Sequence, residues 1–443
     1  MKTPTKTRNT RRKRWRAASL AGAVALVLAG CGGTGGGAGG SGGGKGELLV
    51  WVDNTRMPAA QQYKKAHPDL KMRIVTIPPD AGYVPTKISL ANRTKSGWPD
   101  VVFLANPAEA ATLAGEKFGY AAPLDGLVAK SVRDGFTPGS LDTCTFGGKT
   151  YCLRNDIAPT VLWYDATLMK RYGYQVPKTW AEYQRTGLKA AEEHPGTIVG
   201  AVNGKYGAGI YFGSSGCPTR DTLSLTEVHI DLGGPTCTRV ADLLQPLARE
   251  KAVTTVVPID PGFAKFGKGD KILMLPAPAW FGDFMFGPAF KVPKGRISAA
   301  PMPTWPGENK PYAGQVGGGA FLVSAHAGGR TKEAADLVRW MTTDVNLQAK
   351  QPTYPAFTAA AKKWGEAKSE DPYYASDPMP ALSAAANALR PGFGAVRYEA
   401  DWQSSFNDTV GKTIDSGGNL RGTLGSWQDK LEAAAKTSGY TVG

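Results

Sequence analysis

The sequence predicts an α/β fold with two lobes, and three features of the chain support this prediction. Strand-like apolar runs alternate with helical stretches from residue 47 onward, in the order β-α-β-α-β-α. Such alternation is typical of a mostly parallel sheet that is wrapped by helices. The chain is 42% hydrophobic, and about 400 residues of this composition can bury two hydrophobic cores.

The first strands and helices follow one another at short intervals. Leu48–Val52 is an apolar run that predicts a buried strand, and a polar helical stretch follows it. Thr179-Trp-Ala-Glu182 is a capping box, which predicts the start of a later helix. The predicted strands are 48–52, 72–77, 99–104 and 161–164, and the predicted helices are 58–66, 87–95, 107–117 and 179–193.

Short polar side chains follow the first and third predicted strands. Asp53 comes directly after the first strand, and Asn106 comes just after the third. In a parallel sheet, ligands bind beyond the carboxyl ends of the strands. We therefore expect both side chains near a ligand, where they can form hydrogen bonds with hydroxyl groups.

The N-terminus has the three parts of a secretory signal peptide. Residues 2–16 carry eight basic residues and no acid, and an apolar run follows at Leu20–Leu28. That run is about half as long as a membrane-spanning helix, so we expect residues 1–30 to be removed. The ending Leu28-Ala29-Gly30-Cys31 resembles a bacterial lipobox, which implies cleavage before Cys31 and lipidation of its thiol. The alternative is an ordinary signal peptide with a chance cysteine, and Arg11-Arg12 also permits a twin-arginine export route.

Residues 31–46 are predicted to tether the exported protein to the outer face of the bacterial cell membrane. They are mostly glycine and have almost no side chain to bury, so we expect a flexible coil of about 20 Å. The whole chain has a net charge of +15, and loss of the eight N-terminal bases leaves 44 basic and 37 acidic residues, or +7. This excess forms no basic stripe along the sequence, which argues against a nucleic-acid partner.

Four cysteines remain if Cys31 carries lipid, and their even number agrees with export. Three pairings are open, of which the local ones, Cys144–Cys152 and Cys217–Cys237, are the most economical. A hairpin around Gly147-Gly148 would place Cys144 opposite Tyr151, so the first bridge needs a bulge or a slip in register. No CxxC motif or histidine cluster accompanies these cysteines, so we expect no zinc site and no other metal or cofactor.

Five blocks of the chain resemble one protein family, and they occur in that family's order from residue 47 to 443. The segment Leu162–Leu168 with Pro177-Lys-Thr-Trp180 is the most specific match. The other blocks are Leu49-Val-Trp-Val with Tyr63-Lys-Lys-Ala-His-Pro68, Gly97-Trp-Pro-Asp-Val-Val-Phe103, Phe266–Met274 with Ala279-Trp280, and Gly317–Val323 ahead of a helix at 333–341. The chain is similar to the extracellular solute-binding proteins of ABC importers, in the sugar-binding group typified by maltose-binding protein.

This resemblance implies the type II periplasmic-binding-protein fold, with a ligand cleft between two α/β lobes. It predicts lobe 1 at 47–158 plus 315–353 and lobe 2 at 159–314 plus 354–443. The chain would cross the hinge near Pro159, Tyr312–Val316 and Tyr354. The implied function is capture of a di- or oligosaccharide by a monomeric subunit, with delivery to the transmembrane subunits of an ABC permease.

Sugar capture needs aromatic rings for the C–H faces of the sugar and polar side chains for its hydroxyls. Most single aromatic residues serve core packing, and for that reason Trp51 and Trp163 are assigned to the sheets. The predicted ligand-binding residues are Asp53, Asn106, Asp156, Tyr211, Trp280, Gln315, Arg397 and Trp402. At Leu104 the chain departs from the maltose-binding pattern, which has an aromatic residue there, so the resemblance does not extend to maltodextrin as the ligand.

No motif in the chain calls for catalysis, and no catalytic residue is predicted. The sequence has four histidines, none at metal-binding spacing, and it lacks the HExxH, GxSxG and SxxK motifs. Gly262–Lys268 resembles a P-loop, but Gly269 stands where a magnesium-binding Ser or Thr is needed. Two alternatives remain: a lipid-anchored glycosidase, since its carboxylate pair needs no linear motif, and a sensor or adhesin on the same fold.

Overall fold

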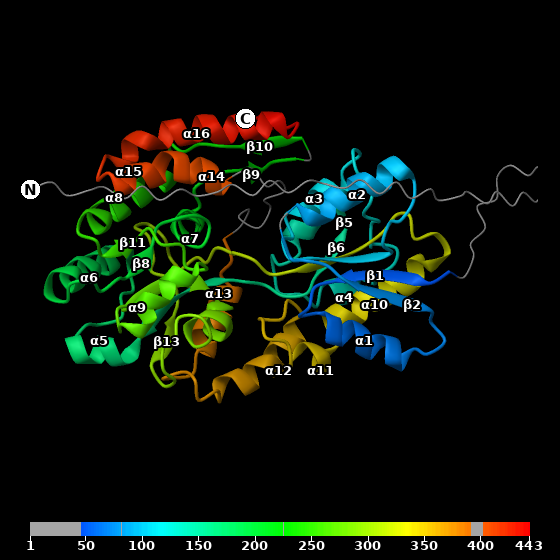
Figure 1. Cartoon of the computed structure of the whole chain (residues 1–443), viewed down its shortest axis with the longest axis horizontal. Coiled ribbons are helices and arrows are strands. Elements are labelled where there is room, and N and C mark those ends of the chain that lie inside the picture. Colours follow the sequence, from blue (N-terminus) through cyan, green and yellow to red (C-terminus); the bar gives the residue numbers. More distant parts are fainter. Residues whose placement is uncertain (1–45, 81, 225, 391–401) are drawn as a thin grey trace, which may run out of the picture. The chain divides into compact units, whose positions relative to one another are not determined.

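The computed structural model describes residues 46–80, 82–224, 226–390 and 402–443 (Figure 1). The predicted signal peptide, Cys31, most of the glycine-rich segment and the predicted ligand-binding residue Arg397 lie outside these ranges. The described residues belong to one compact unit. None of the described helices combines the length and the apolar character that a membrane crossing requires.

The first main sheet has five strands in the order β2-β1-β3-β14-β6. They are β2 (Met72–Thr76), β1 (Leu48–Val52), β3 (Val101–Leu104), β14 (Ala320–Val323) and β6 (Cys152–Arg154). β1 pairs in parallel with both β2 and β3, as predicted. β14 returns to this sheet from far along the chain and runs antiparallel to β3 and β6, so the mostly parallel pattern is correct only for the first three strands.

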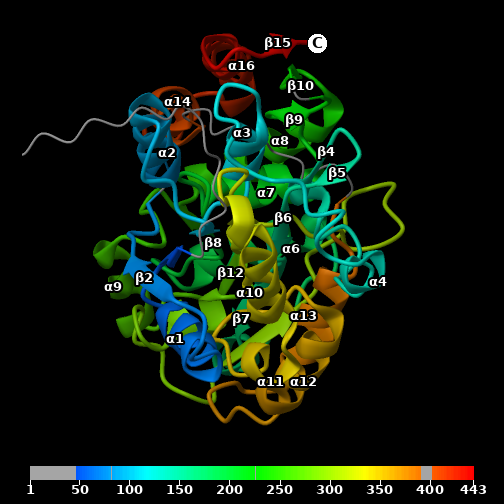
Figure 2. The ribbon, with the colours of Figure 1, turned by 90° about the vertical axis from the view of Figure 1, so that its right-hand side faces the viewer.

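Helices cover both faces of the first sheet. Val50 and Phe103 point into a core that includes Tyr63 of α1 (Met57–Ala66) and Leu337 of α10 (Thr331–Thr343). Figure 2 looks onto α1 and α10 on this face. The opposite face, represented by Val102, packs against α2 (Tyr83–Thr94) and α3 (Glu109–Ala114). Alternate residues of each strand therefore serve two different cores.

The second main sheet is antiparallel, which corrects the expectation of a mostly parallel arrangement. Its central strand β7 (Thr160–Asp165) is flanked by β12 (Met274–Pro278) and β13 (Ile297–Ala300). The predicted strand at 161–164 is confirmed, and Trp163 is 0% exposed, as expected of a core residue. Its neighbours come from much later in the chain, so nothing local to β7 revealed their direction.

Helices of the second half surround this sheet. The capping box is confirmed at the start of α6 (Trp180–Glu193), where the Glu182 N–H donates to Thr179 Oγ1 over 3.2 Å. The other helices are α5 (Ala166–Tyr172), α7 (Ala208–Ser215), α8 (Pro235–Arg249), α9 (Ala264–Lys268), α14 (Trp402–Phe406), α15 (Lys412–Asp415) and α16 (Leu420–Thr437). α16 lies beside α8 and contributes Trp427, which is 0% exposed, to the second core.

Short elements complete the described chain. The small strands are β4 (Thr145–Phe146), β5 (Lys149–Thr150), β8 (Gly200–Ala201), β9 (Asp221–Thr222), β10 (Glu227–His229), β11 (Val253–Thr254) and β15 (Thr441–Val442). The remaining helices are α4 (Lys130–Arg133), α11 (Val345–Gln348), α12 (Thr358–Ser369) and α13 (Met379–Ala386), with single turns η1 (Asp142–Cys144), η2 (Pro261–Phe263), η3 (Gly282–Phe286), η4 (Gly328–Arg330) and η6 (Asn407–Gly411).

Three chain segments run side by side between the two main sheets. The Ile157 N–H donates to Tyr354 O over 2.9 Å, and the Val316 N–H donates to Ala158 O over 3.1 Å. Isolated bridges pair Asp156 with Pro355 and Pro159 with Gln315. These contacts occur at the three places where the resemblance puts the hinge, while the lobe boundaries themselves stay a prediction.

Both local disulfides predicted from spacing are present. Cys144 is bonded to Cys152, and Cys217 is bonded to Cys237. The hairpin β4–β5 has the expected register, and Tyr151 N–H donates to Cys144 O over 2.8 Å. Because Cys144 closes the turn η1 rather than extending β4, the backbone geometry there lets its sulfur reach Cys152 instead of facing Tyr151.

Candidate ligand-binding site

A cavity of about 360 Å³ lies between residues at the edge of the first main sheet and residues around α7, a helix that contacts β12 of the second sheet. This volume lies within the roughly 300–1,000 Å³ that small-molecule sites occupy. One wall comes from the segments after β2 and β3, from β6 and from the segment before β14. The other comes from the segment before α7, from α7 itself, from residues 219–221 and from the start of α14. Three of the predicted residues, Asn106, Gln315 and Trp402, belong to this lining.

Asn106 reaches the cavity because β3 ends at Leu104 and the chain turns at once into α3. The Ala108 N–H donates to Asn106 Oδ1 over 3.3 Å, which fixes this turn. Asp53, at the end of the neighbouring strand β1, lines a small crevice together with Asn106. The structure thus brings the two strand-end residues together, although only Asn106 borders the larger cavity. Leu104 is 1% exposed and belongs to the core.

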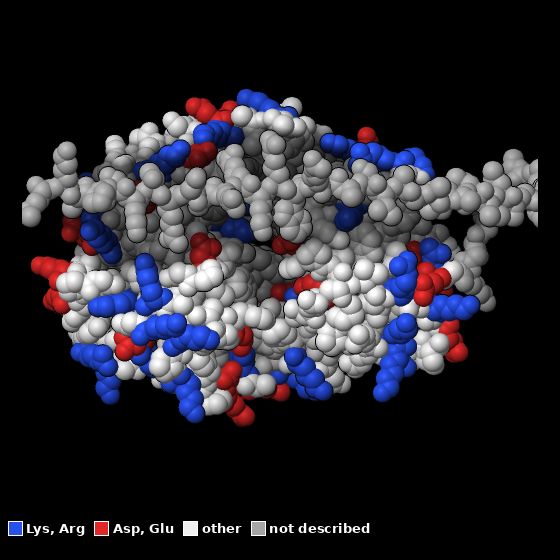
Figure 3. Space-filling view, in the orientation of Figure 1, with Lys and Arg blue, Asp and Glu red and all other residues white. Residues whose placement is uncertain are grey.

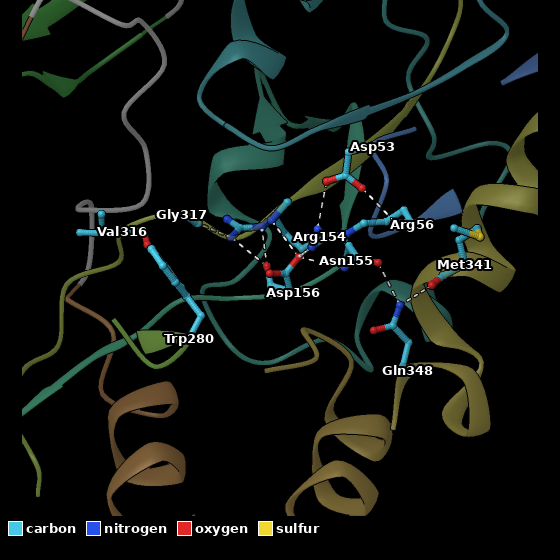
Figure 4. Close-up of polar contacts among 11 residues, drawn as sticks. Asp53, Arg56, Arg154, Asn155, Asp156, Trp280, Val316, Gly317, Met341 and Gln348 are labelled. Carbon is cyan, nitrogen blue, oxygen red and sulfur yellow. Dashed lines mark hydrogen bonds and ion pairs between the residues drawn. The ribbon is translucent and has the colours of Figure 1, made fainter. Parts of the chain in front are cut away.

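Asp53 and Asp156 form a buried ion-pair network beneath this wall (Figure 4). Arg56 lies between them, with Nη1 3.2 Å from Asp53 Oδ2 and Nη2 3.0 Å from Asp156 Oδ1. Asp156 Oδ1 also accepts hydrogen bonds from Asn155 Nδ2 and from the Gly319 N–H, each over 2.9 Å. The network ties β1 to β6 and β14. Because the Asp156 carboxylate is already bound to protein groups, this geometry gives it a structural role.

Arg154 lies in the wall itself and is 1% exposed. Its Nε donates to Asp156 O over 3.2 Å, its Nη1 donates to Thr143 Oγ1 over 3.0 Å, and its Nη2 lies 3.4 Å from Gly317 O. Burial lowers the pKa of this guanidinium to about 10, partly offset by the nearby Asp156 carboxylate, so it stays charged at neutral pH. Arg154 was not predicted from the sequence, since no motif distinguishes it from other arginines.

The segment before β14 needs its glycines. Gly318 has φ +79°, and a β-carbon there would overlap the Arg154 guanidinium and lie 2.7 Å from Asp156 O. Gly317 also has positive φ (+98°) and lines the cavity. Just before them, Gln315 also faces the cavity, and its buried Oε1 accepts no hydrogen bond from the residues that the structure describes. A buried oxygen without a donor is suited to accept a hydrogen bond from a hydroxyl group of a ligand.

The opposite wall is aromatic and includes Tyr206, Phe212 and Trp402. Trp402 is 5% exposed and stacks on Phe406, with ring centroids 5.3 Å apart and planes 2° apart. Trp280 is not among the lining residues. Its ring packs edge-to-face against Tyr206 at 5.8 Å, and its Nε1 donates to Val316 O over 3.0 Å (Figure 4). Trp280 therefore supports the wall from behind, and direct contact with a ligand stays a prediction.

Tyr211 lies in the core and not at the cavity. It is 0% exposed, and its hydroxyl lies 2.8 Å from the hydroxyl of Tyr183. Burial raises the pKa of Tyr211 well above its ordinary value. The residues of α7 that line the cavity are Gly209, Phe212 and Gly213, so the helix turns Tyr211 toward the second core. The geometry lends no support to the predicted ligand contact.

Charged side chains of both signs complete the lining. Lys205 and Arg220 are basic, and Asp221 carries the one carboxylate among the described lining residues. Burial raises the pKa of Asp221 from 3.8 to about 6, against the opposing effects of His229 and Arg220. Asp221 was not predicted from the sequence, because it begins a two-residue strand and belongs to no motif.

No metal centre accompanies these groups in the described part of the chain, where no cluster of three or more His, Cys, Asp or Glu could hold an ion. On the face shown in Figure 3, Lys and Arg side chains are scattered among Asp and Glu rather than gathered into a stripe.

Comparison with known proteins places the chain in a family. The model of the bacterial extracellular solute-binding proteins matches residues 51–348, which is more than half of the chain. The arabinooligosaccharide-binding protein of Bacillus subtilis (strain 168) is 25% identical over 321 residues, which span 68% of this chain and 69% of that protein.

Solved structures share the fold. The galacto-N-biose/lacto-N-biose I-binding protein of the ABC transporter from Bifidobacterium longum, in complex with lacto-N-biose, has a TM-score of 0.73 at 20% identity, over 89% of this chain and 98% of that one. The ABC transporter associated binding protein from B. animalis subsp. lactis Bl-04, in complex with β-1,6-galactobiose, has a TM-score of 0.70 at 21% identity, over 89% and 99%. The predicted two-lobed α/β fold is thereby confirmed. The chain belongs to the bacterial extracellular solute-binding proteins, a family of binding proteins and not of enzymes.

Proposed function

We propose that the chain is the substrate-binding subunit of an ABC importer and that it captures a di- or oligosaccharide in the described cavity. The observation that carries this proposal is the composition of the cavity wall. Aromatic rings at Tyr206, Phe212 and Trp402 face polar groups at Asn106 and Gln315 across one space. A sugar needs this combination, because its C–H faces are apolar and its edges carry hydroxyl groups.

Relatives support the same ligand class. By their names, the relative from Bacillus subtilis binds an arabinooligosaccharide, and the two structural neighbours bind lacto-N-biose and β-1,6-galactobiose. These ligands differ from one another, so the relatives favour an oligosaccharide without selecting one sugar.

Capture would proceed by closure of the two predicted lobes around the ligand. One cavity wall lies at the first main sheet and the other around α7, and three adjacent segments near residues 157, 316 and 354 connect the two main sheets. A ligand that contacts both walls only when they approach each other shifts the population toward the closed form. The family resemblance supports delivery to a permease, and the N-terminal sequence supports tethering through a lipid on Cys31.

A glycosidase is the weaker alternative on this geometry. Glycoside hydrolysis ordinarily uses a pair of carboxylates on either side of the scissile bond. Asp221 supplies one carboxylate, and the part of the lining that the structure describes offers no second one.

A thermal-shift screen of the purified chain tests the proposal. The probes are arabinotriose, lacto-N-biose and β-1,6-galactobiose, with arabinose and glucose as monosaccharide controls. A ligand at a hundred times its dissociation constant stabilises the folded protein by about 2.7 kcal/mol, which moves the melting temperature measurably. Saturable stabilisation with the saccharide recovered intact supports a binding protein. Recovery of cleaved saccharide would favour the glycosidase, and stabilisation by none of the probes would contradict an oligosaccharide of these classes.

A further inference from the structure

Among the charged side chains of the described cavity lining, Asp221 has the fewest hydrogen-bond and ion-pair partners. It is mostly buried at the cavity surface, yet it forms no hydrogen bond and no ion pair within 4.0 Å through its side chain to any residue in the described ranges. An ionised carboxylate with few partners is costly to bury, so a protein rarely keeps one without a use for it.

The groups around Asp221 do not neutralise it. Arg220 adjoins it in sequence, and His229 is its partner on the neighbouring strand β10. Both lower the pKa of Asp221, but burial outweighs them and leaves it near 6. The His229 ring is engaged elsewhere, with Nδ1 3.0 Å from Gly443 O. Arg154 and Lys205 are the other charged groups in the described lining.

We infer that Asp221 is a specificity-determining residue that accepts hydrogen bonds from hydroxyl groups of an uncharged saccharide. This inference rests on the proposed function. A carboxylate offers two acceptor oxygens and can take two hydroxyl donors at once. A cationic ligand such as an amino sugar could pair with Asp221, but it would face the basic groups of Arg154, Lys205 and Arg220 in the same cavity.

Hydroxyl recognition of this kind makes affinity depend on pH. The ionised carboxylate is the stronger acceptor, and it predominates above about pH 6. At pH 5 about one carboxylate in ten remains ionised if the pKa is near 6, so the apparent affinity should fall about tenfold from its value at pH 7.5. The direction is fixed by the protonation state: binding weakens as the medium becomes acidic.

Calorimetric titrations of the wild-type chain and of Asp221→Asn at pH 7.5 and pH 5 test the inference. The probe is whichever of arabinotriose, lacto-N-biose and β-1,6-galactobiose binds the wild type most tightly. Asparagine keeps the shape and removes the charge, so we expect about 10- to 100-fold weaker binding at pH 7.5 and less than about twofold change between the two pH values.

Two control variants isolate the carboxylate. Asp231→Asn removes one charge from the same half of the chain, outside the cavity lining, and keeps the Oδ1 acceptor for the Gly234 N–H. His229→Gln removes the imidazole that lies opposite Asp221 on β10 and lowers the pKa of that carboxyl. Asp231→Asn should bind like the wild type and keep its pH dependence. His229→Gln should bind like the wild type at pH 7.5 but lose affinity at a higher pH than the wild type does, because the pKa of Asp221 then rises further.

The outcomes separate this inference from the proposed function. Wild-type binding that Asp221→Asn leaves within twofold, or leaves equally pH-dependent, would overturn the role of Asp221 alone. Tighter binding of galactosamine or another amino sugar, lost in Asp221→Asn, would overturn the uncharged ligand class. No binding of any probe to the wild type would contradict the proposed function and this inference with it.

Discussion

Replacing Arg56 by methionine should destabilise the protein strongly, because two buried carboxylates depend on it. The side chains of Asp53, Arg56 and Asp156 are 9%, 11% and 3% exposed. Breaking a buried ion pair by removing one partner typically costs about 3–5 kcal/mol, since the remaining charge is left uncompensated. Here Asp156 keeps its bonds from Asn155 and Gly319, so we expect the lower end, about 3 kcal/mol.

Urea unfolding of the wild type, Arg56→Met, Asp156→Asn and the double variant measures this loss. The double variant also removes the Asp156 carboxylate, which Arg56→Met alone leaves without its ion-pair partner. It should therefore be more stable than Arg56→Met. Arg73→Met is the matched control, because Arg73 pairs with Glu47 at the surface, where both side chains are at least half exposed. Arg73→Met should lower the free energy of unfolding by less than about 1 kcal/mol. An Arg56→Met loss no larger than the Arg73→Met loss would refute the buried network as a source of stability.

Three further predictions concern the glycine turn, a disulfide and the cavity carboxylate. Gly318→Ala should cost more than about 1 kcal/mol in urea unfolding, because its φ is positive and its β-carbon would meet Arg154; an unchanged midpoint would contradict this. Joint replacement of Cys217 and Cys237 by alanine should cost about 3 kcal/mol, the value expected for a loop of twenty residues; a melting temperature equal to that of the wild type would contradict it. Without ligand, Asp221→Asn should raise the melting temperature at pH 7.5, because ionising a carboxyl whose pKa is raised to about 6 costs the folded state up to roughly 3 kcal/mol. That gain should shrink as the pH falls from about 6 toward 3.8, and a gain that grows in acid would show the opposite shift.

Local chemistry accounts for the parts of the fold that the sequence predicted well. The strand β1 and the start of helix α6 depend on neighbouring residues, an apolar run in one case and the Thr179–Glu182 capping box in the other. The local disulfides follow from short loops between their cysteines. Strand direction was wrong wherever the partner lay far away, as for β14 beside β3 and for β12 beside β7, because no local pattern encodes such pairing.

In the candidate site, too, local sequence predicted some residues, whereas others depend on contacts between distant parts of the chain. The position of Asn106 at the cavity was predictable, because the residue follows the carboxyl end of a parallel strand and ligands bind at that edge of such a sheet. The aromatics could not be sorted from the sequence: Tyr206 lines the cavity, whereas Tyr211, five residues later, lies in the core. Both residues are tyrosines, and only the packing of α7 against the second core places one in the core and the other at the cavity. Asp221 had no local signal, since its importance comes from burial without a partner.

A calorimetric titration of the Tyr206→Ala variant tests the central claim, capture of an oligosaccharide against the aromatic wall, most directly. Tyr206 is half-buried and lines the cavity, and Tyr172→Ala serves as the control because Tyr172 stacks on His194 outside the lining. With the saccharide that binds the wild type best, Tyr206→Ala should bind at least about tenfold more weakly, as expected when an aromatic contact worth about 1.4 kcal/mol or more is lost. Tyr172→Ala should bind within twofold of the wild type. Equal affinity of the wild type and Tyr206→Ala for every saccharide would contradict the account.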